Sequence, residues 1–195
     1  MFNAGSSDAW YEPWGLNTTL PAEGWFSEYP IRRAGAAFSR QIVATSFVES
    51  SDSVLQSRVY ALLNTLKDTL DARNATTTQL QRLFDSRPSP SGIRVLYGVA
   101  RRTFASPAGE SCEAVIHLQA WFAVDDAGVR MVSPEVIHGS CTEMNARIAT
   151  PYALFEIDGS QYVAAEWMMY EATERDVLRV TAAEVTSVLL ERRGN

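Results

Sequence analysis

The segment SCEAVIHLQAWFAV, residues 111–124, has the clearest two-residue alternation of side chains in the chain. One set of alternate positions is apolar, and the other contains Glu113, His117 and Gln119. A period of two is typical of a strand that turns one face toward a core. We therefore predict a half-buried β-strand here. Its apolar face would consist of Cys112, Ala114, Ile116, Leu118, Ala120, Phe122 and Val124.

Two hairpins are predicted around and after this strand. Residues 125–128, DDAG, form a turn sequence that leads into VRMVS, and Asp158-Gly159-Ser160 separates YALFEI from QYVAAEWMMYEA. Such turn residues between apolar runs indicate hairpins. The last of these segments is apolar on both faces, which favours a central strand. Residues 93–180 thus predict an antiparallel, curved meander of four to six strands.

Two helices are predicted before this sheet. Residues 53–74 carry leucines and a valine at helical spacing, and a capping box at Ser53 would begin the helix. A second capping box at Thr78 would begin a shorter helix that runs through Phe84. Residues 87–92, RPSPSG, would end it and form a linker, because a residue before proline disfavours the helical conformation.

The C-terminal end predicts a third helix. Thr181 and Glu184 form another capping-box pattern, which would open a helix over 182–193. A strand is expected within 37–48, which is rich in β-branched and aromatic residues. The predicted fold class is α+β. It has an irregular arm at 1–36 and one domain at 37–195, divided into a helical part at 51–87, the meander at 93–180 and the closing helix.

The N-terminal arm is unusual in composition. Residues 10–30, WYEPWGLNTTLPAEGWFSEYP, hold three of the five tryptophans and show no helix or strand periodicity. Disordered segments are poor in aromatics, so a plain tail is disfavoured. Either the arm covers its own sheet or it docks on a neighbouring subunit, where aromatic residues carry interface energy. The residues expected to make such contacts are Trp10, Tyr11, Trp14, Trp25, Phe26 and Tyr29.

Composition limits the classes of partner. The chain has 195 residues and a formal net charge of −6, which argues against binding to nucleic acid or to an anionic membrane surface. It contains no secretion signal and no apolar run of about 20 residues. We predict a cytoplasmic protein, or one in a particle assembled in the cytoplasm.

The sequence contains no cofactor or catalytic motif such as a Walker loop, a nucleophile elbow or His-Glu-x-x-His. No cofactor is therefore predicted. His117 and Glu166 are candidates for acid–base catalysis if burial perturbs them. Trp121, Tyr152 and Trp167 are candidates for lining a pocket, although core packing is the usual role of large aromatic residues.

The two cysteines, Cys112 and Cys141, are expected to be buried free thiols, with a disulfide as the alternative if their strands are neighbours. Neither they nor His117 and His138 show zinc-ligand spacing, so no metal site is predicted. A catalytic pair between His138 and Cys141 is also disfavoured, because a turn after a strand explains their proximity in sequence.

Two functions follow from these patterns. The first is a non-enzymatic assembly or interaction protein, a homo-oligomer or a component of a virus particle or another large complex, held together by the aromatic arm. The alternative is a small-molecule-binding or enzymatic domain with a pocket between helices and sheet. Helices followed by a curved antiparallel sheet resemble the cone-shaped folds of the nuclear-transport-factor-2-like kind, and this resemblance is one of architecture only.

Overall fold

The computed structural model describes residues 44–72, 75–88, 92–104, 112, 114–139, 141, 147–157, 159–169, 172–181 and 183–194. Within them the chain forms nine strands, one α-helix and a short 3₁₀ helix. The elements are β1 (Ala44–Glu49), α2 (Ser53–Leu63), η3 (Thr69–Ala72), β2 (Ala75–Ser86), β3 (Arg94–Phe104), β4 (Ala114–Asp125), β5 (Gly128–Gly139), β6 (Ile148–Ile157), β7 (Ser160–Met169), β8 (Ala172–Val180) and β9 (Val185–Gly194). The predicted aromatic arm, with Trp10, Tyr11, Trp14, Trp25, Phe26 and Tyr29, lies outside the described residues.

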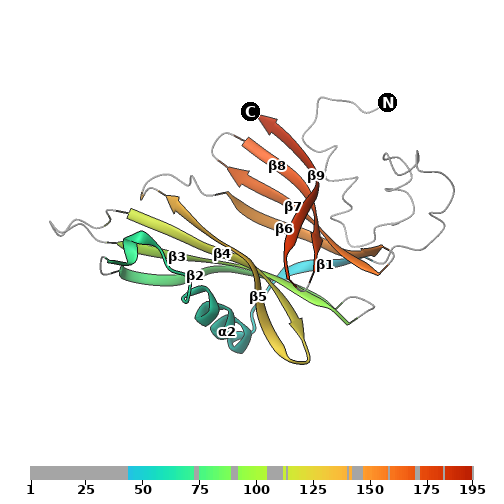
Figure 1. The fold of residues 1–195 in the computed structure, drawn as a ribbon, viewed down its shortest axis with the longest axis horizontal. Coiled ribbons are helices and arrows are strands. Elements are labelled where there is room, and N and C mark those ends of the chain that lie inside the picture. Colours follow the sequence, from blue (N-terminus) through green and yellow to red (C-terminus); the bar gives the residue numbers. More distant parts are fainter. Residues whose placement is uncertain are drawn as a thin grey trace.

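All nine strands belong to one antiparallel sheet with the order β5-β4-β3-β2-β1-β6-β7-β8-β9. The central strand β1 pairs with β2 on one side and with β6 on the other. Two four-stranded meanders, β2–β5 and β6–β9, extend from it and face one another (Figure 1). The backbone N–H of Val185 on β9 donates to Ser133 Oγ on β5 at 2.8 Å. The two edge strands therefore meet at one point, and the sheet is nearly closed and barrel-like.

The predicted α+β class is wrong, because the described part of the chain is mostly β-strand with a single α-helix. The predicted sheet of four to six strands is also too small: the sheet has nine strands, of which β3 to β8 lie between residues 94 and 180. The turn at 125–128 and the turn at Gly159 both join adjacent antiparallel strands. The errors lie on either side of this region, where helices were expected and strands β2 and β9 are found.

The first predicted helix is confirmed only in part. It ends at Leu63, far short of residue 74, and a 3₁₀ turn follows. Its N-cap is Asp52 and not Ser53, since Asp52 Oδ1 accepts hydrogen bonds from the backbone N–H groups of Val54 and Leu55 at 2.9 and 3.0 Å. An aspartate carboxylate is a strong N-cap acceptor.

The second predicted helix, from Thr78 to Phe84, is instead part of β2. This strand pairs with β3 along most of its length, from Ala75 opposite Phe104 to Asp85 opposite Leu96. The predicted linker at 87–92 therefore connects two adjacent strands, and Gly92 within it has a φ of +82°. The pairing partner β3 decided the conformation, since β2 gains a full row of backbone hydrogen bonds there.

The predicted C-terminal helix is strand β9. Thr181 Oγ1 accepts from the N–H groups of Ala183 and Glu184 at 3.2 and 3.0 Å, and Thr181 N donates to Glu184 O at 2.9 Å. A threonine side chain makes the same local bonds at a helix N-cap and in a tight turn. Here they close the β8–β9 turn, so the pattern at Thr181 identified a chain reversal and not a helix start.

The sheet has two large cores, besides one small cluster around Phe155 and Ala164. One lies between the two meanders and contains residues from β3, β4, β6, β7 and β8. The other lies between α2 and the outer face of β2–β5. Strand β4 contributes to both: Trp121 faces the interior, and Ile116, Leu118 and Phe122 face the helix. It was predicted as a half-buried strand, and it is buried on both faces because α2 covers the second one.

No helix among the described residues has both the length and the apolar character needed to cross a membrane.

Candidate functional site

The interior between the meanders has an apolar end and a polar end. The apolar end is built from Val95, Leu154, Val163, Leu178 and Val180, with Val185 packed against them. Strand directions place a row of polar residues at the other end. Its buried members are His117, Gln119, Glu174 and Asp176.

Aromatic side chains separate the two ends. The rings of Tyr97 and Trp121 lie 4.7 Å apart between centroids, and those of Tyr97 and Trp167 lie 6.3 Å apart. Phe47 from the central strand contacts Trp121 edge-on at 6.4 Å. The structure thus places two of the three predicted pocket residues in a packed aromatic layer.

A hydrogen-bonded chain begins at Tyr97. Its hydroxyl donates to Gln119 Oε1 at 2.8 Å and accepts from the backbone N–H of Ala149 at 3.0 Å. Gln119 Nε2 donates to Glu135 Oε2 at 2.7 Å and to the carbonyl oxygen of Arg147 at 3.0 Å. Burial raises the pKa of Tyr97 well above its usual value, so this phenol remains a neutral donor. The network joins β3, β4, β5 and the start of β6.

An ion pair and a second carboxylate complete the polar end. Arg147 Nε donates to Glu174 Oε2 at 3.0 Å, and its guanidinium lies 4.0 Å from the centroid of the Trp167 ring. Asp176, two residues along β8, accepts from Ser187 Oγ at 2.7 Å. Burial is the main cause that raises the pKa of Asp176, and the nearby Glu174 raises it further. Two carboxylates thus share one interior face, with Arg147 as their counter-ion.

The two predicted acid–base residues are not brought together. Glu166 alternates along β7 with Ala165 and Trp167, which belong to the interior core, so it faces outward. There its Oε2 accepts from Arg175 Nε at 3.1 Å. His117 lies on the interior face of β4. The structure therefore offers no joint acid–base role for His117 and Glu166.

Tyr152, the third predicted pocket residue, is partly buried on β6, at the register shift between Pro151 and Ala153. Five residues of the polar end were not predicted as site residues: Arg101, Gln119, Arg147, Glu174 and Asp176. A signal for the last two existed in ATERDVLRV, where Glu174 and Asp176 continue the same alternate positions as Leu178 and Val180. Charged residues that extend an apolar stripe indicate the end of a core.

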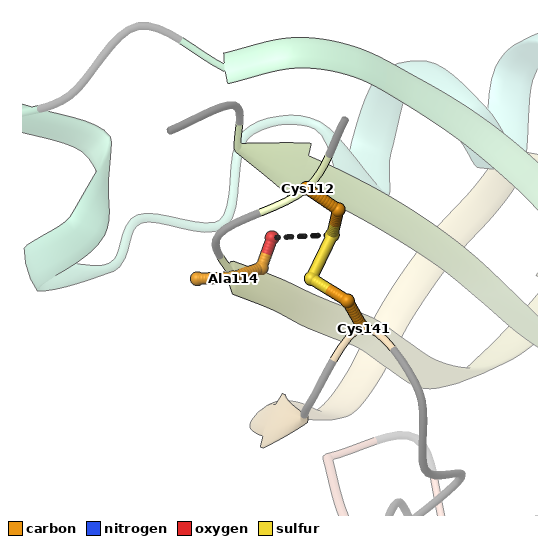
Figure 2. The surroundings of a disulfide bond; sticks show 3 residues. All are labelled: Cys112, Ala114 and Cys141. Atoms are coloured by element: carbon orange, nitrogen blue, oxygen red, sulfur yellow. Dashed lines mark hydrogen bonds between the residues drawn. A yellow bond between two sulfur atoms is a disulfide. The ribbon is translucent and has the colours of Figure 1, made fainter. Parts of the chain in front are cut away.

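The prediction of free cysteines is wrong. Cys112 and Cys141 form a disulfide, with their Cα atoms 6.0 Å apart (Figure 2). The Cys112 sulfur lies 3.7 Å from the Ala114 carbonyl oxygen. The physical reason is the register of β4 and β5, which sets Val115 opposite Gly139 and so brings the adjoining residues together.

The disulfide also removes Cys141 as a nucleophile. The Nε2 atom of His138 lies 2.9 Å from Oδ2 of Asp68, the residue just before η3. Among the described residues, no group of histidine, cysteine and acidic side chains has the arrangement of a metal site.

On the described part of the surface, the most conspicuous apolar feature is on the edge strand β9. Val188, Leu189 and Leu190 are consecutive and are 52%, 51% and 50% exposed. Of the strands that the structure describes, only β8 pairs with β9. The other edge strand, β5, carries the exposed Pro134 and a register shift opposite Gln119 and Trp121. Proline and irregular register are common means of blocking an edge from further pairing. β9 has no proline along its length, but it has a register shift against β8 at Val188.

Comparison with family models, with curated proteins and with solved structures gave no match to this chain. The geometry of the polar interior and of the β9 edge is therefore the basis for a functional proposal.

Proposed function

We propose that this chain is a non-enzymatic assembly protein, a homo-oligomer or a component of a larger particle such as a virus particle, whose copies associate through β9 and the aromatic arm. The observation that carries the proposal is the run of half-exposed apolar residues Val188 to Leu190 on an edge strand. A long apolar edge is a template for pairing with another chain. Association would cover both the backbone groups and the apolar side chains.

A second copy of the same chain fits this edge. Antiparallel pairing about a two-fold axis at Leu189 sets this residue opposite its own copy and Val188 opposite Leu190 of the second copy. A two-fold contact is self-complementary, which is the commonest symmetry of homo-oligomers. Apolar residues would then face apolar residues across the new strand pair.

The aromatic arm supplies the area that β9 lacks. Stable interfaces bury about 1,200–2,000 Å² in total, and three half-exposed side chains per copy contribute only part of this. Each docked aromatic residue of the arm would add roughly 150–250 Å². We therefore assign the arm, residues 10–30, as the second contact between copies.

Analytical ultracentrifugation of three variants tests the proposal. Leu189→Arg should shift the protein toward monomer, because it places a charge at the centre of the pairing. Met168→Arg is the matched control, since Met168 is 40% exposed but lies on β7, which is paired on both sides. Deletion of residues 1–36 should weaken association separately. A wild-type protein that is monomeric at all concentrations and captures no partner would overturn the proposal.

The alternative function is binding of a small molecule, and a specific observation favours a place for it. The predicted pocket between helices and sheet is filled: a Cβ atom added to Gly98 on β3 would lie 2.8 Å from Val59 Cγ1 on α2. The polar end of the interior has instead the charged and polar groups that orient ligands in such sites.

A further inference from the structure

Arg101 and His117 form a distinct pair at the polar end of the interior. They are directly opposite one another on β3 and β4. Arg101 continues the alternate positions of Tyr97 and Val99, and His117 continues those of Gln119 and Trp121, so both belong to the interior face. His117 is 7% exposed.

One buried nitrogen atom of each side chain has no hydrogen-bonding partner among the described residues. Arg101 Nε and His117 Nδ1 are both buried, and no atom in the described part of the chain accepts from or donates to them. Arg101 also forms no ion pair there. A buried polar atom without a partner is costly, and a buried charge without one is more so. Native structures with such groups commonly hold an ion, a ligand or a water beside them.

Other partly buried arginines of the sheet are paired, which makes Arg101 an exception. Arg94 pairs with Asp85, Arg147 with Glu174 and Arg175 with Glu166. The next residue in the chain, Arg102, points to the other face and donates to Asn64 Oδ1 at 2.9 Å. The described part of the fold therefore supplies an acceptor for each of these groups and none for the Nε atom of Arg101.

The surroundings of His117 favour a bound anion. Burial lowers the pKa of His117 first, and the positive charge of Arg101 lowers it further. The residue opposite it on β5 is Ile137, and Gly139, opposite Val115, lies next to the imidazole ring; neither carries a charge. A Cβ atom at Gly139 would lie 3.3 Å from the imidazole ring, so a larger residue at this position would crowd the ring.

We propose that Arg101 and His117 bind an anionic oxygen group, a carboxylate or a phosphate, of a small ligand at the polar end of the interior. The guanidinium offers two parallel N–H donors to such a group, and the imidazole offers one more. The single positive charge of the pair balances one negative charge. The carboxylates of Glu135 and Glu174 are already bonded to Gln119 and Arg147. This site is independent of the β9 contact.

The experiment is an NMR titration of the full-length protein with sodium phosphate and with sodium acetate, against sodium chloride at equal ionic strength. The chain has only two histidines, so His138→Gln leaves one imidazole signal to follow. Binding of phosphate or acetate should raise the pKa of His117, because the anion offsets the charge of Arg101. An effect of acetate alone identifies a carboxylate ligand, and an effect of phosphate alone identifies a phosphate ligand.

Arg101→Gln should weaken binding roughly ten- to a hundredfold, the usual effect of losing a hydrogen bond to a charged group. Arg179→Gln on β8 is the control, since it removes the same charge from an exposed position. If Arg101→Gln does not fold, Arg101→Lys serves in its place. Lysine keeps the positive charge but lacks the two parallel N–H donors of arginine, so this variant should bind the anion more weakly than the wild type.

Two results would overturn the proposal. One is a His117 signal that responds to neither anion. The other is a response to the chain's own carboxylates: Glu110, Glu113 and Glu143 lie in segments outside the described residues. If replacing these three by glutamine lowers the pKa of His117, the anion belongs to the protein itself and no ligand is needed.

Discussion

The two halves of the sheet differ in what covers their outer faces. Helix α2 lies over β2–β5, where Leu55, Val59 and Leu63 pack on the strands. No helix of the described residues lies over the outer face of β6–β9 (Figure 1). The apolar residues exposed on that half are found on β7 and β9, among them Met168 and Leu189.

This difference shows that the burial pattern of a strand depends on what covers each of its two faces. β4, beneath the helix, is buried at nearly every position, whereas β8 alternates between buried and partly exposed residues. On the uncovered half, Phe155 and Tyr162 stack at 5.7 Å and form only a small cluster with Ala164 at its centre. The uncovered half therefore retains apolar surface, and our proposal assigns the part of it on β9, Val188 to Leu190, to assembly.

The largest expected effect is on the covered half. Leu63→Ala should reduce the free energy of unfolding by about 2–5 kcal/mol, because Leu63 is fully buried between helix and sheet and its removal leaves a cavity. Met168→Ala on the uncovered half should change it by no more than about 0.5 kcal/mol. Urea unfolding of both variants measures the difference, and equal losses would contradict the comparison.

Removal of the disulfide should have the next largest effect. Replacing Cys112 and Cys141 together by alanine opens a crosslink that spans 29 residues between β4 and β5. A loss of about 2–4 kcal/mol is expected from the greater freedom of the unfolded chain. Reduction of the wild-type protein should reproduce this loss in urea unfolding. If reduced and oxidised protein unfold at the same urea concentration, the bond does not stabilise the covered half.

The smallest expected effect is on how the free energy of unfolding depends on pH, through His117 on the interior face of the covered half. The pKa of His117 is lowered in the folded state, so below about pH 6.5 the unfolded chain binds the proton more readily. Stability should therefore fall as the pH drops through this range, by at most about 1.4 kcal/mol per pH unit.

His117→Asn should remove this slope, and His138→Asn on the exposed side should leave it in place. Chemical unfolding at pH 5, 6 and 7 measures the slope in each variant. An unchanged slope in His117→Asn would mean that other groups, such as the buried Asp176, control the pH dependence.

The sequence alone identified the regions where local pattern and long-range packing agree. The alternation at β4, the turn before Gly128 and the hairpin at Gly159 were predicted correctly, because each depends on a few adjacent residues. The start of α2 was found to within one residue. The candidate site was found only through His117 and two core tryptophans, since the other members come from strands that are distant in sequence.

Three features of this protein were decided by tertiary structure. Segments 78–84 and 185–193 are strands because a neighbouring strand accepts their hydrogen bonds, although their local patterns suit a helix equally well. The disulfide required the register of β4 and β5. Arg101 and His117 became a pair because β3 and β4 set them opposite one another. The sequence alone determines where a turn, an alternating strand pattern or a helix cap can form, since each depends on a few adjacent residues. Pairing between distant strands determines which of these possibilities is realised, because the hydrogen bonds and burial that it adds exceed any local preference.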